Sequence, residues 1–228
     1  NPVDDGQSAT CTATPGNGYR FTGSGGDCAA SGTTATCTLT DVRAPKSVTA
    51  GFAPITTHSG ITVPTAGTSG VAGPGSASFT GGGSACRFDN TATGFEAAPA
   101  TPPTGQVLPQ GMFRFKLIGC DTGVAPVTMR VTWPQAISGY TKHGKAASNA
   151  PSASYFAPTG LAFDPDGRTA TFIVADGQLG DDDWQENGEI ADPTGPTALA
   201  AGPSAGPHAI TVAPSTGGSI VCTPNPVA

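Results

Sequence analysis

The chain has 228 residues, of which 33 are glycine and 22 are proline, and only 11% are charged. Frequent Gly and Pro exclude long helices, and a 37% apolar content with so little charge argues against a disordered chain. The net charge of −6 excludes the basic face of a nucleic-acid-binding protein, and no apolar run reaches the length of roughly 20 residues that spans a bilayer.

The first 53 residues contain several short segments in which apolar and polar residues alternate, as is typical of half-buried strands. We interpret residues 1–53 as a small β module, either β-grasp-like or a simple β-sheet. A module of this size has a thin core and usually needs a covalent staple. Cys28 and Cys37 bracket a short loop that a disulfide would close.

Residues 54–200 predict a second, larger domain. The clearest strands are residues 112–120 and 127–133, where the alternation is strongest. The turn residues 164–167 separate two further strand-like runs and predict a hairpin. At least six strands with regular turns imply a β-sandwich, in which Cys86 and Cys120 would staple two strands. The fold class is therefore all-β.

The chain contains six cysteines, and none has the spacing of a zinc site. An even count in a polar, Gly/Thr-rich chain favours disulfides and an oxidising compartment over free thiols. We therefore expect an extracellular or cell-surface protein.

An acidic run over residues 176–193 holds seven of the sixteen acidic residues. Like charges in one short loop repel each other, and calcium, which prefers several oxygen ligands on a flexible loop, would remove that cost. The alternative is a solvated acidic turn. The candidate calcium ligands are Asp176, Asp181, Asp183, Asn187 and Asp192.

No motif of an enzyme is evident, because His58, His143 and His208 are far apart and none lies in a known catalytic signature. We expect no catalytic activity and no required cofactor. Tyr140 and Tyr155 lie in a Gly/Ser/Ala-rich stretch and are candidates for stacking on a surface glycan, although packing over an edge of the sandwich is the favoured explanation.

Two regions resemble known bacterial domains. Residues 60–200 resemble the choice-of-anchor U domain, which implies an exported bacterial protein without enzymatic activity. The residues that carry this resemblance are 112–115, 119–123, 131–134 and the acidic segment from Asp176. Residues 1–53 resemble the divergent internalin-type B repeat, a small β unit of bacterial surface proteins, through residues 11–15, 18–21, 26–28, 36–39 and 46–52.

The repeat-like module lacks the opening hairpin of complete units, and residues 208–227 resemble that hairpin. A sheet without its first strands has an unpaired edge, and a detached hairpin is not stable alone. Residues 201–228 would then be a linker and donor strands, with the run from Thr194 to Pro207 letting them reach out. The predicted subunit-interface residues are Ile210, Val212, Ile220 and Cys222.

Donation of these strands to a neighbouring copy would build a head-to-tail filament. If Cys28 bonds Cys37 and Cys86 bonds Cys120, then Cys11 and Cys222 remain, and they would lie on neighbouring strands of a completed module. The function predicted is a structural subunit of a bacterial extracellular filament, with copies of itself as partners. The alternatives are one repeat of a longer tandem surface protein or adhesin, and a chain whose tail closes its own module.

Overall fold

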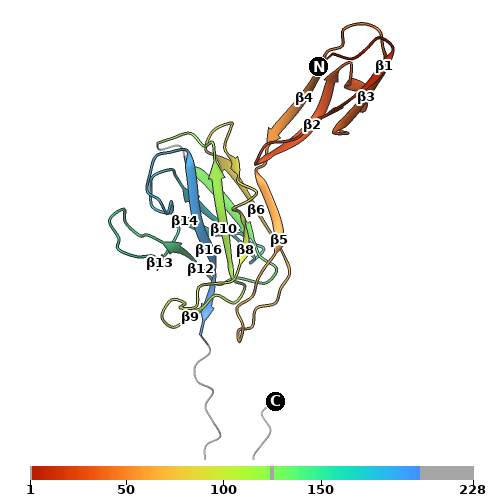
Figure 1. Cartoon of the computed structure of the whole chain (residues 1–228). Coiled ribbons are helices and arrows are strands. Elements are labelled where there is room, and N and C mark those ends of the chain that lie inside the picture. The colour runs from red at the N-terminus through yellow and green to blue at the C-terminus, as the bar shows by residue number, and fades with distance from the viewer. Residues whose placement is uncertain (1, 124–125, 201–228) are drawn as a thin grey trace, which may run out of the picture.

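The computed structural model describes residues 2–123 and 126–200. The N-terminal module forms a separate lobe of two antiparallel two-stranded sheets (Figure 1). In the first, β1 (Gln7–Thr12) pairs with β3 (Thr36–Val42), and in the second, β2 (Tyr19–Gly26) pairs with β4 (Val48–Pro54). The helical content of the described part of this lobe is the 3-10 turn η1 (Ala29–Ser31), and its strands form a simple β-sheet structure.

The second lobe is a sandwich of two antiparallel sheets. The larger sheet has the order β13 (Ser154–Phe156), β12 (Gly139–Gly144), β16 (Glu189–Leu199), β10 (Met112–Ile118) and β7 (Arg87–Phe88), with β8 (Gly94–Glu96) beside β10 and β9 (Gln106–Val107) beside β16. The smaller sheet has the order β14 (Thr159–Phe163), β15 (Thr169–Val174), β11 (Val127–Thr132), β6 (Pro74–Gly81) and β5 (Thr57–Ile61). Strands make up 47% of the residues and helix 2%, which confirms the all-β prediction.

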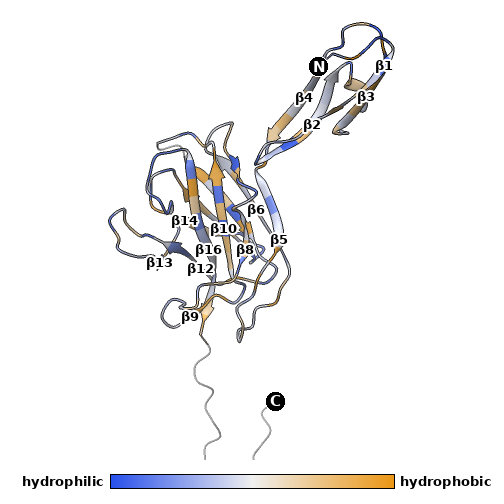
Figure 2. Ribbon diagram, in the orientation of Figure 1, coloured by the Kyte–Doolittle hydropathy of each residue, from blue (hydrophilic) through white to orange (hydrophobic). Residues whose placement is uncertain are grey.

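The core lies between the two sheets and follows the alternation of the sequence. Along β10, Phe113, Phe115 and Leu117 are fully buried, and the polar residues between them are more exposed. Figure 2 shows hydrophobic and hydrophilic colours in turn along β10. They join a cluster that includes Met129 of β11 and Phe172 of β15 from the opposite sheet. The two strongest predicted strands are therefore confirmed. Alternating apolar and polar residues are typical of a sheet that is buried on one face.

The predicted hairpin at residues 164–167 joins β14 and β15. Asp166 organises the turn, since its carboxylate accepts hydrogen bonds from the backbone N–H of Arg168 at 2.8 Å and of Thr169 at 3.0 Å. The hydroxyl of Thr169 donates to the second oxygen at 2.6 Å. An aspartate that bonds the backbone two or three residues ahead is the usual way in which this residue stabilises a turn.

Strand β16 corrects one prediction, because residues 194–199 were expected to begin a linker. They instead continue a central strand between β10 and β12. Pro193 pairs only with β10, and Pro196 only with β12. Each proline thus lies where the strand has one neighbour, so its missing N–H leaves no carbonyl of a second strand without a donor.

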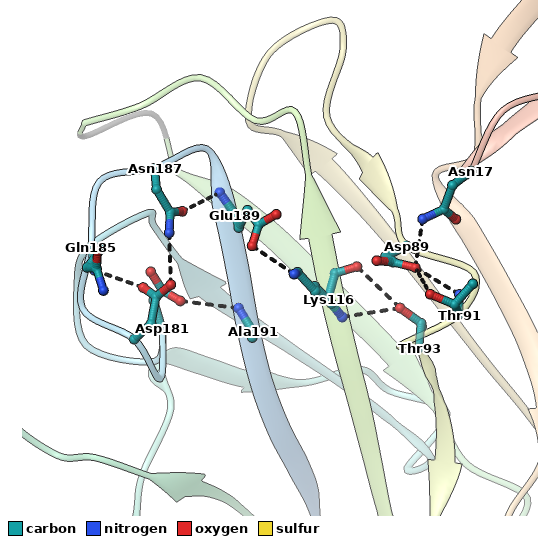
Figure 3. A network of polar contacts seen from close by, with 11 residues as sticks. Asn17, Asp89, Thr91, Thr93, Lys116, Asp181, Gln185, Asn187, Glu189 and Ala191 are labelled. Carbon is teal, nitrogen blue, oxygen red and sulfur yellow. Dashed lines mark hydrogen bonds and ion pairs between the residues drawn. The ribbon is translucent and has the colours of Figure 1, made fainter.

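The two lobes meet at a small polar junction. The side chain of Asn17 donates to Asp89 Oδ1 at 2.9 Å and accepts from the backbone N–H of Asn90 at 3.1 Å (Figure 3). The backbone continues the contact, since Ile55 donates to Gly18 at 2.7 Å and accepts from Phe88 at 2.9 Å. The junction therefore combines side-chain and main-chain hydrogen bonds.

Arg87 completes the junction from the side of the sandwich. Its Nε donates to the carbonyl of Asn17 at 3.0 Å, and its guanidinium lies 4.3 Å from the centre of the Tyr19 ring. A cation over an aromatic face is attracted by the ring quadrupole. Module and sandwich thus share one contact surface.

Candidate functional site

The candidate site on the N-terminal module lies between the strands β1 and β4. Among the described residues, β1 pairs only with β3 and β4 pairs only with β2. Neither strand has a partner on its second edge, so each presents unpaired backbone N–H and C=O groups there. Such an edge is a template for the addition of another strand.

A groove of about 730 Å³ opens between these strands. Its apolar lining comes from both sheets, namely Ala9, Cys11, Leu39, Val42 and Val48. A smaller cavity of about 100 Å³ shares Cys11 and Val48 with it and extends to Cys37. The groove is therefore lined by residues of β1 and β4, the two strands whose second edges have no partner among the described residues.

The core of the module is correspondingly thin. Among its described residues, the buried apolar side chains are those of Cys28, 1% exposed, and Cys37, 7% exposed. Val48 and Phe52 remain 38% and 42% exposed. Apolar side chains that line an open groove carry a cost in water that a further strand would remove. The disulfide between Cys28 and Cys37 confirms the predicted staple.

Cys11 lies inside this groove and has no disulfide partner among the described residues. It stands opposite Cys37 in the register of β1 and β3, and Cys37 is already bonded to Cys28. The second predicted staple, between Cys86 and Cys120, is also present. Cys222, like Ile210, Val212 and Ile220, lies outside the described residues, so the third pairing and the predicted donor contacts stay predictions.

The acidic run of residues 176–193 is held in place by hydrogen bonds between its own residues (Figure 3). Asp181 accepts from the backbone N–H of Gly177 at 2.9 Å and of Ala191 at 3.2 Å. Asn187 donates its side-chain N–H to Asp183 at 2.9 Å and accepts from the backbone N–H of Glu189 at 2.8 Å. These contacts occupy many of the oxygens that a cation would need.

The described part of the chain brings no three His, Cys, Asp or Glu side chains into a metal-binding group. Of the predicted calcium ligands, Asp176 accepts from the backbone N–H of Gly188 at 2.8 Å, and Asp192 pairs with Lys142. Four of the five residues therefore lie in the loop and Asp192 lies in β16, and each turns at least one oxygen toward an internal partner. Calcium binding stays an untested prediction.

The buried pair of Lys142 and Asp192 was not expected from the sequence. Lys142 extends from β12 and is 1% exposed, and Asp192 extends from β16 and is fully buried. Burial lowers the pKa of Lys142, against the opposing effect of Asp192. Burial also raises the pKa of Asp192 to about 7, although the nearby ammonium opposes this shift. A lone lysine within a six-residue strand gave no signal of this pairing.

The two aromatic residues considered for glycan stacking lie in strands and not in the predicted loop. Tyr140 lies in β12 and is only 6% exposed, within the core beside Trp133, so it is not a surface loop residue. Tyr155 in β13 is half-buried, and the centre of its ring lies 4.6 Å from the centre of the His143 ring. Tyr155 lines an open groove of about 440 Å³ together with Phe156, Phe163 and part of Tyr140.

Comparison with known families gives a match to the N-terminal module. A model of the divergent InlB B-repeat domain matches residues 1–56, about a quarter of the chain. No curated protein and no solved structure matches the chain. The resemblance to the choice-of-anchor U domain is not confirmed.

The match and the two disulfides together indicate a module of a bacterial surface protein with an extracellular or surface location. In the residues that the structure describes, no helix has the length and apolar character needed to cross a membrane. The N-terminal lobe is therefore similar to a bacterial surface-repeat domain.

Proposed function

We propose that the chain is a structural subunit of a bacterial extracellular filament, assembled by strand donation between copies. The observation that carries this proposal is the groove between β1 and β4, with a free strand edge on each side. The occupant is residues 208–227 of a second copy, whose sequence alternates apolar and polar residues as a donated hairpin requires.

The chemistry of the groove supports this occupant. Ala9, Leu39, Val42 and Val48 offer apolar contacts for Ile210, Val212 and Ile220. Strand donation would supply backbone partners to β1 and β4 and would bury these side chains at the same time. Because the donated segment and the groove come from different ends of the sequence, the contact is heterologous and propagates.

A disulfide formed by Cys11 would make the assembly detectable on a denaturing gel. Its position in the groove supports a disulfide to Cys222 of the incoming segment. We expect the oxidised wild type to run as a ladder on a denaturing gel and to collapse to a monomer on reduction. Cys11→Ser and Cys222→Ser should each abolish the ladder while leaving fibres visible by electron microscopy.

Deletion of residues 208–228 tests the proposal itself. The shortened chain should remain monomeric and form no fibres, and a synthetic peptide of residues 208–227 should bind it and raise the melting temperature of the module. The matched control is a peptide with Ile210, Val212 and Ile220 changed to Asp. Fibres from the shortened chain, or a wild type that stays monomeric with Cys11 unbonded, would contradict strand donation. An oxidised monomer with Cys11 bonded to Cys222 would identify a tail that closes its own module.

A second function, binding of surface glycans, is favoured by the groove around Tyr155. Phe156 and Phe163 line the same groove, and half-buried aromatic rings beside polar groups suit a sugar face. Glycan-array binding that is lost in Tyr155→Ala and retained in Phe52→Ala, which alters an exposed ring of the other lobe, would support an adhesin. We propose no catalytic role for either function.

A further inference from the structure

The strongest feature that the proposed function does not use is the buried pair of Lys142 and Asp192. Their strands are neighbours, and Lys142 pairs with Thr194 in the register of β12 and β16. Asp192 lies two residues before Thr194, so both side chains project from the same face of the sheet. The Lys142 ammonium contacts the Asp192 carboxylate directly, and both side chains are excluded from water.

The surroundings of this pair are built to hold it. Asp192 stands opposite the buried Phe115, and the Lys142 ammonium lies 4.8 Å from the centre of the Phe172 ring. A Cβ at Gly180 would collide with Nζ of Lys142, and a Cβ at Gly144 would collide with the Asp182 carboxylate. The two glycines thus leave the space that the charged groups occupy.

A third carboxyl group, that of Asp182, acts electrostatically on both members of the pair. The backbone N–H of Asp182 donates to Ala191 at 2.9 Å, which places Asp182 beside Asp192. Oδ1 of Asp182 and Oδ1 of Asp192 are both buried without a hydrogen-bond partner among the described residues. Each such orphaned oxygen costs free energy. The arrangement therefore carries a penalty that hydrogen bonds do not offset.

Exclusion of both side chains from water favours the neutral amine and the neutral acid, because burial penalises each charge. A buried ion pair is weakly stabilising at best, so transfer of a proton from Lys142 to Asp192 gives an amine in contact with a carboxylic acid.

We propose that Nζ of Lys142 and Cγ of Asp192 join as an amide bond within the chain, with Asp182 relaying the proton. Contact between fixed reactants replaces a bimolecular encounter, with effective concentrations of roughly 10⁵ to 10⁸ M in well-oriented cases. Amines of buried lysines are known nucleophiles toward carbonyl carbon. A dry core also favours the direction in which water is released.

The step balances without any co-reactant. The neutral Nζ of Lys142 attacks Cγ of the protonated Asp192, and the new N–C bond forms a tetrahedral centre. Asp182 accepts one N–H proton and delivers it to the departing hydroxyl group. The C–O bond breaks, one water molecule leaves, and the amide nitrogen keeps a single hydrogen. No group is oxidised or reduced.

Intact mass measurement of the denatured and fully reduced chain tests the bond. We expect a mass lower by one water molecule than the sequence requires. Digestion with trypsin should give residues 131–145, uncut after Lys142, joined to the peptide that begins at Thr169. Lys142→Arg and Asp192→Ala should both show the full calculated mass.

Two controls separate this bond from other losses of water. An Asp-Gly sequence, such as Asp166-Gly167 or Asp176-Gly177, also loses water when it forms a succinimide. A loss of water that persists in Lys142→Arg would therefore overturn the proposal, as would a wild type of full mass. Asp182→Asn should lower the bonded fraction at harvest, whereas Asp183→Asn, which alters an exposed neighbour, should leave it complete. An Asp182→Asn chain that bonds completely would overturn the relay.

Discussion

Asn17 and Asp89 meet across the boundary between the two lobes, at a single carboxylate oxygen that accepts three hydrogen bonds. Asp89 Oδ1 receives the side-chain N–H of Asn17 at 2.9 Å, the backbone N–H of Thr91 at 2.8 Å and its hydroxyl at 2.6 Å. Asn17 is thus tied to an oxygen whose position the sandwich has already fixed. The hydrogen bond to this oxygen therefore helps to orient the module relative to the sandwich.

We predict that Asn17→Ala loosens the junction while both lobes stay folded. Loss of the two hydrogen bonds, with Asp89 and Asn90 still able to bond water, should weaken the contact by about 1 kcal/mol. Backbone ¹⁵N relaxation should show the module tumbling faster, relative to the sandwich, than in the wild type. Asn90→Ala keeps the backbone donor that Asn17 uses and should leave the tumbling unchanged. An unchanged Asn17→Ala chain would show that the backbone contacts suffice.

The same junction should depend on pH. The hydrogen bonds from Thr91 and Asn17 lower the pKa of Asp89, against the effect of burial, and Lys116 adds to the lowering. A lowered pKa in the folded state means that the stabilisation is present above the ordinary carboxyl pKa of about 4 and is lost as pH falls through the folded value. We expect the module to loosen in the wild type below about pH 4. In Asp89→Asn this pH dependence should disappear, and a transition that persists in the variant would assign it to another group.

Gly18→Ala should disrupt the junction more severely than Asn17→Ala. Gly18 has φ of +72°, and an added Cβ would collide with the carbonyl of Phe88 and the side chain of Arg87. The left-handed backbone alone costs about 1–2 kcal/mol for alanine. Gly16→Ala is the matched control, since its Cβ would meet no atom within 4 Å. Small-angle scattering should report a broader distribution of lobe orientations for Gly18→Ala and an unchanged distribution for Gly16→Ala.

Removal of the Cys28–Cys37 disulfide should unfold the module and spare the sandwich. These cysteines provide the buried apolar side chains of the described module, and closing a short loop contributes about 2–3 kcal/mol. In Cys28→Ser/Cys37→Ser, NMR signals of residues 7–54 should collapse to random-coil positions while those of the sandwich persist. Cys11→Ser, which touches no observed disulfide, should retain the folded signals. A double variant with an intact module would show that the staple is dispensable.

The sequence predicted the fold best where one face of a strand meets the core. β10, β11 and the hairpin at Asp166 follow alternation and turn chemistry closely. The last strand, β16, was missed because Pro193, Gly195 and Pro196 are typical of linkers, and only its place between β10 and β12 makes it a strand.

The candidate sites divide in the same way. Both observed disulfides were predictable from the sequence. Cys28 and Cys37 bracket a short loop, and Cys86 and Cys120 lie in two predicted strands. The groove beside Cys11 follows from an expectation of missing strands, but its lining depends on how two sheets face each other. Lys142 had no local signature, since its partner Asp192 is 50 residues away and had been assigned to an acidic surface loop. Pairings of this kind arise only when the chain folds.

The central place of β16 has a mechanical consequence. Residues 189–194 of this strand pair with β10, residues 194–197 pair with β12 and residues 198–199 pair with β9, and the strand runs toward the end of the sandwich opposite the module (Figure 1). A pulling force applied between the module and Leu199 would act along this strand. Its antiparallel ladders with both neighbours would then be loaded in shear, so that many hydrogen bonds share the tension and must break together.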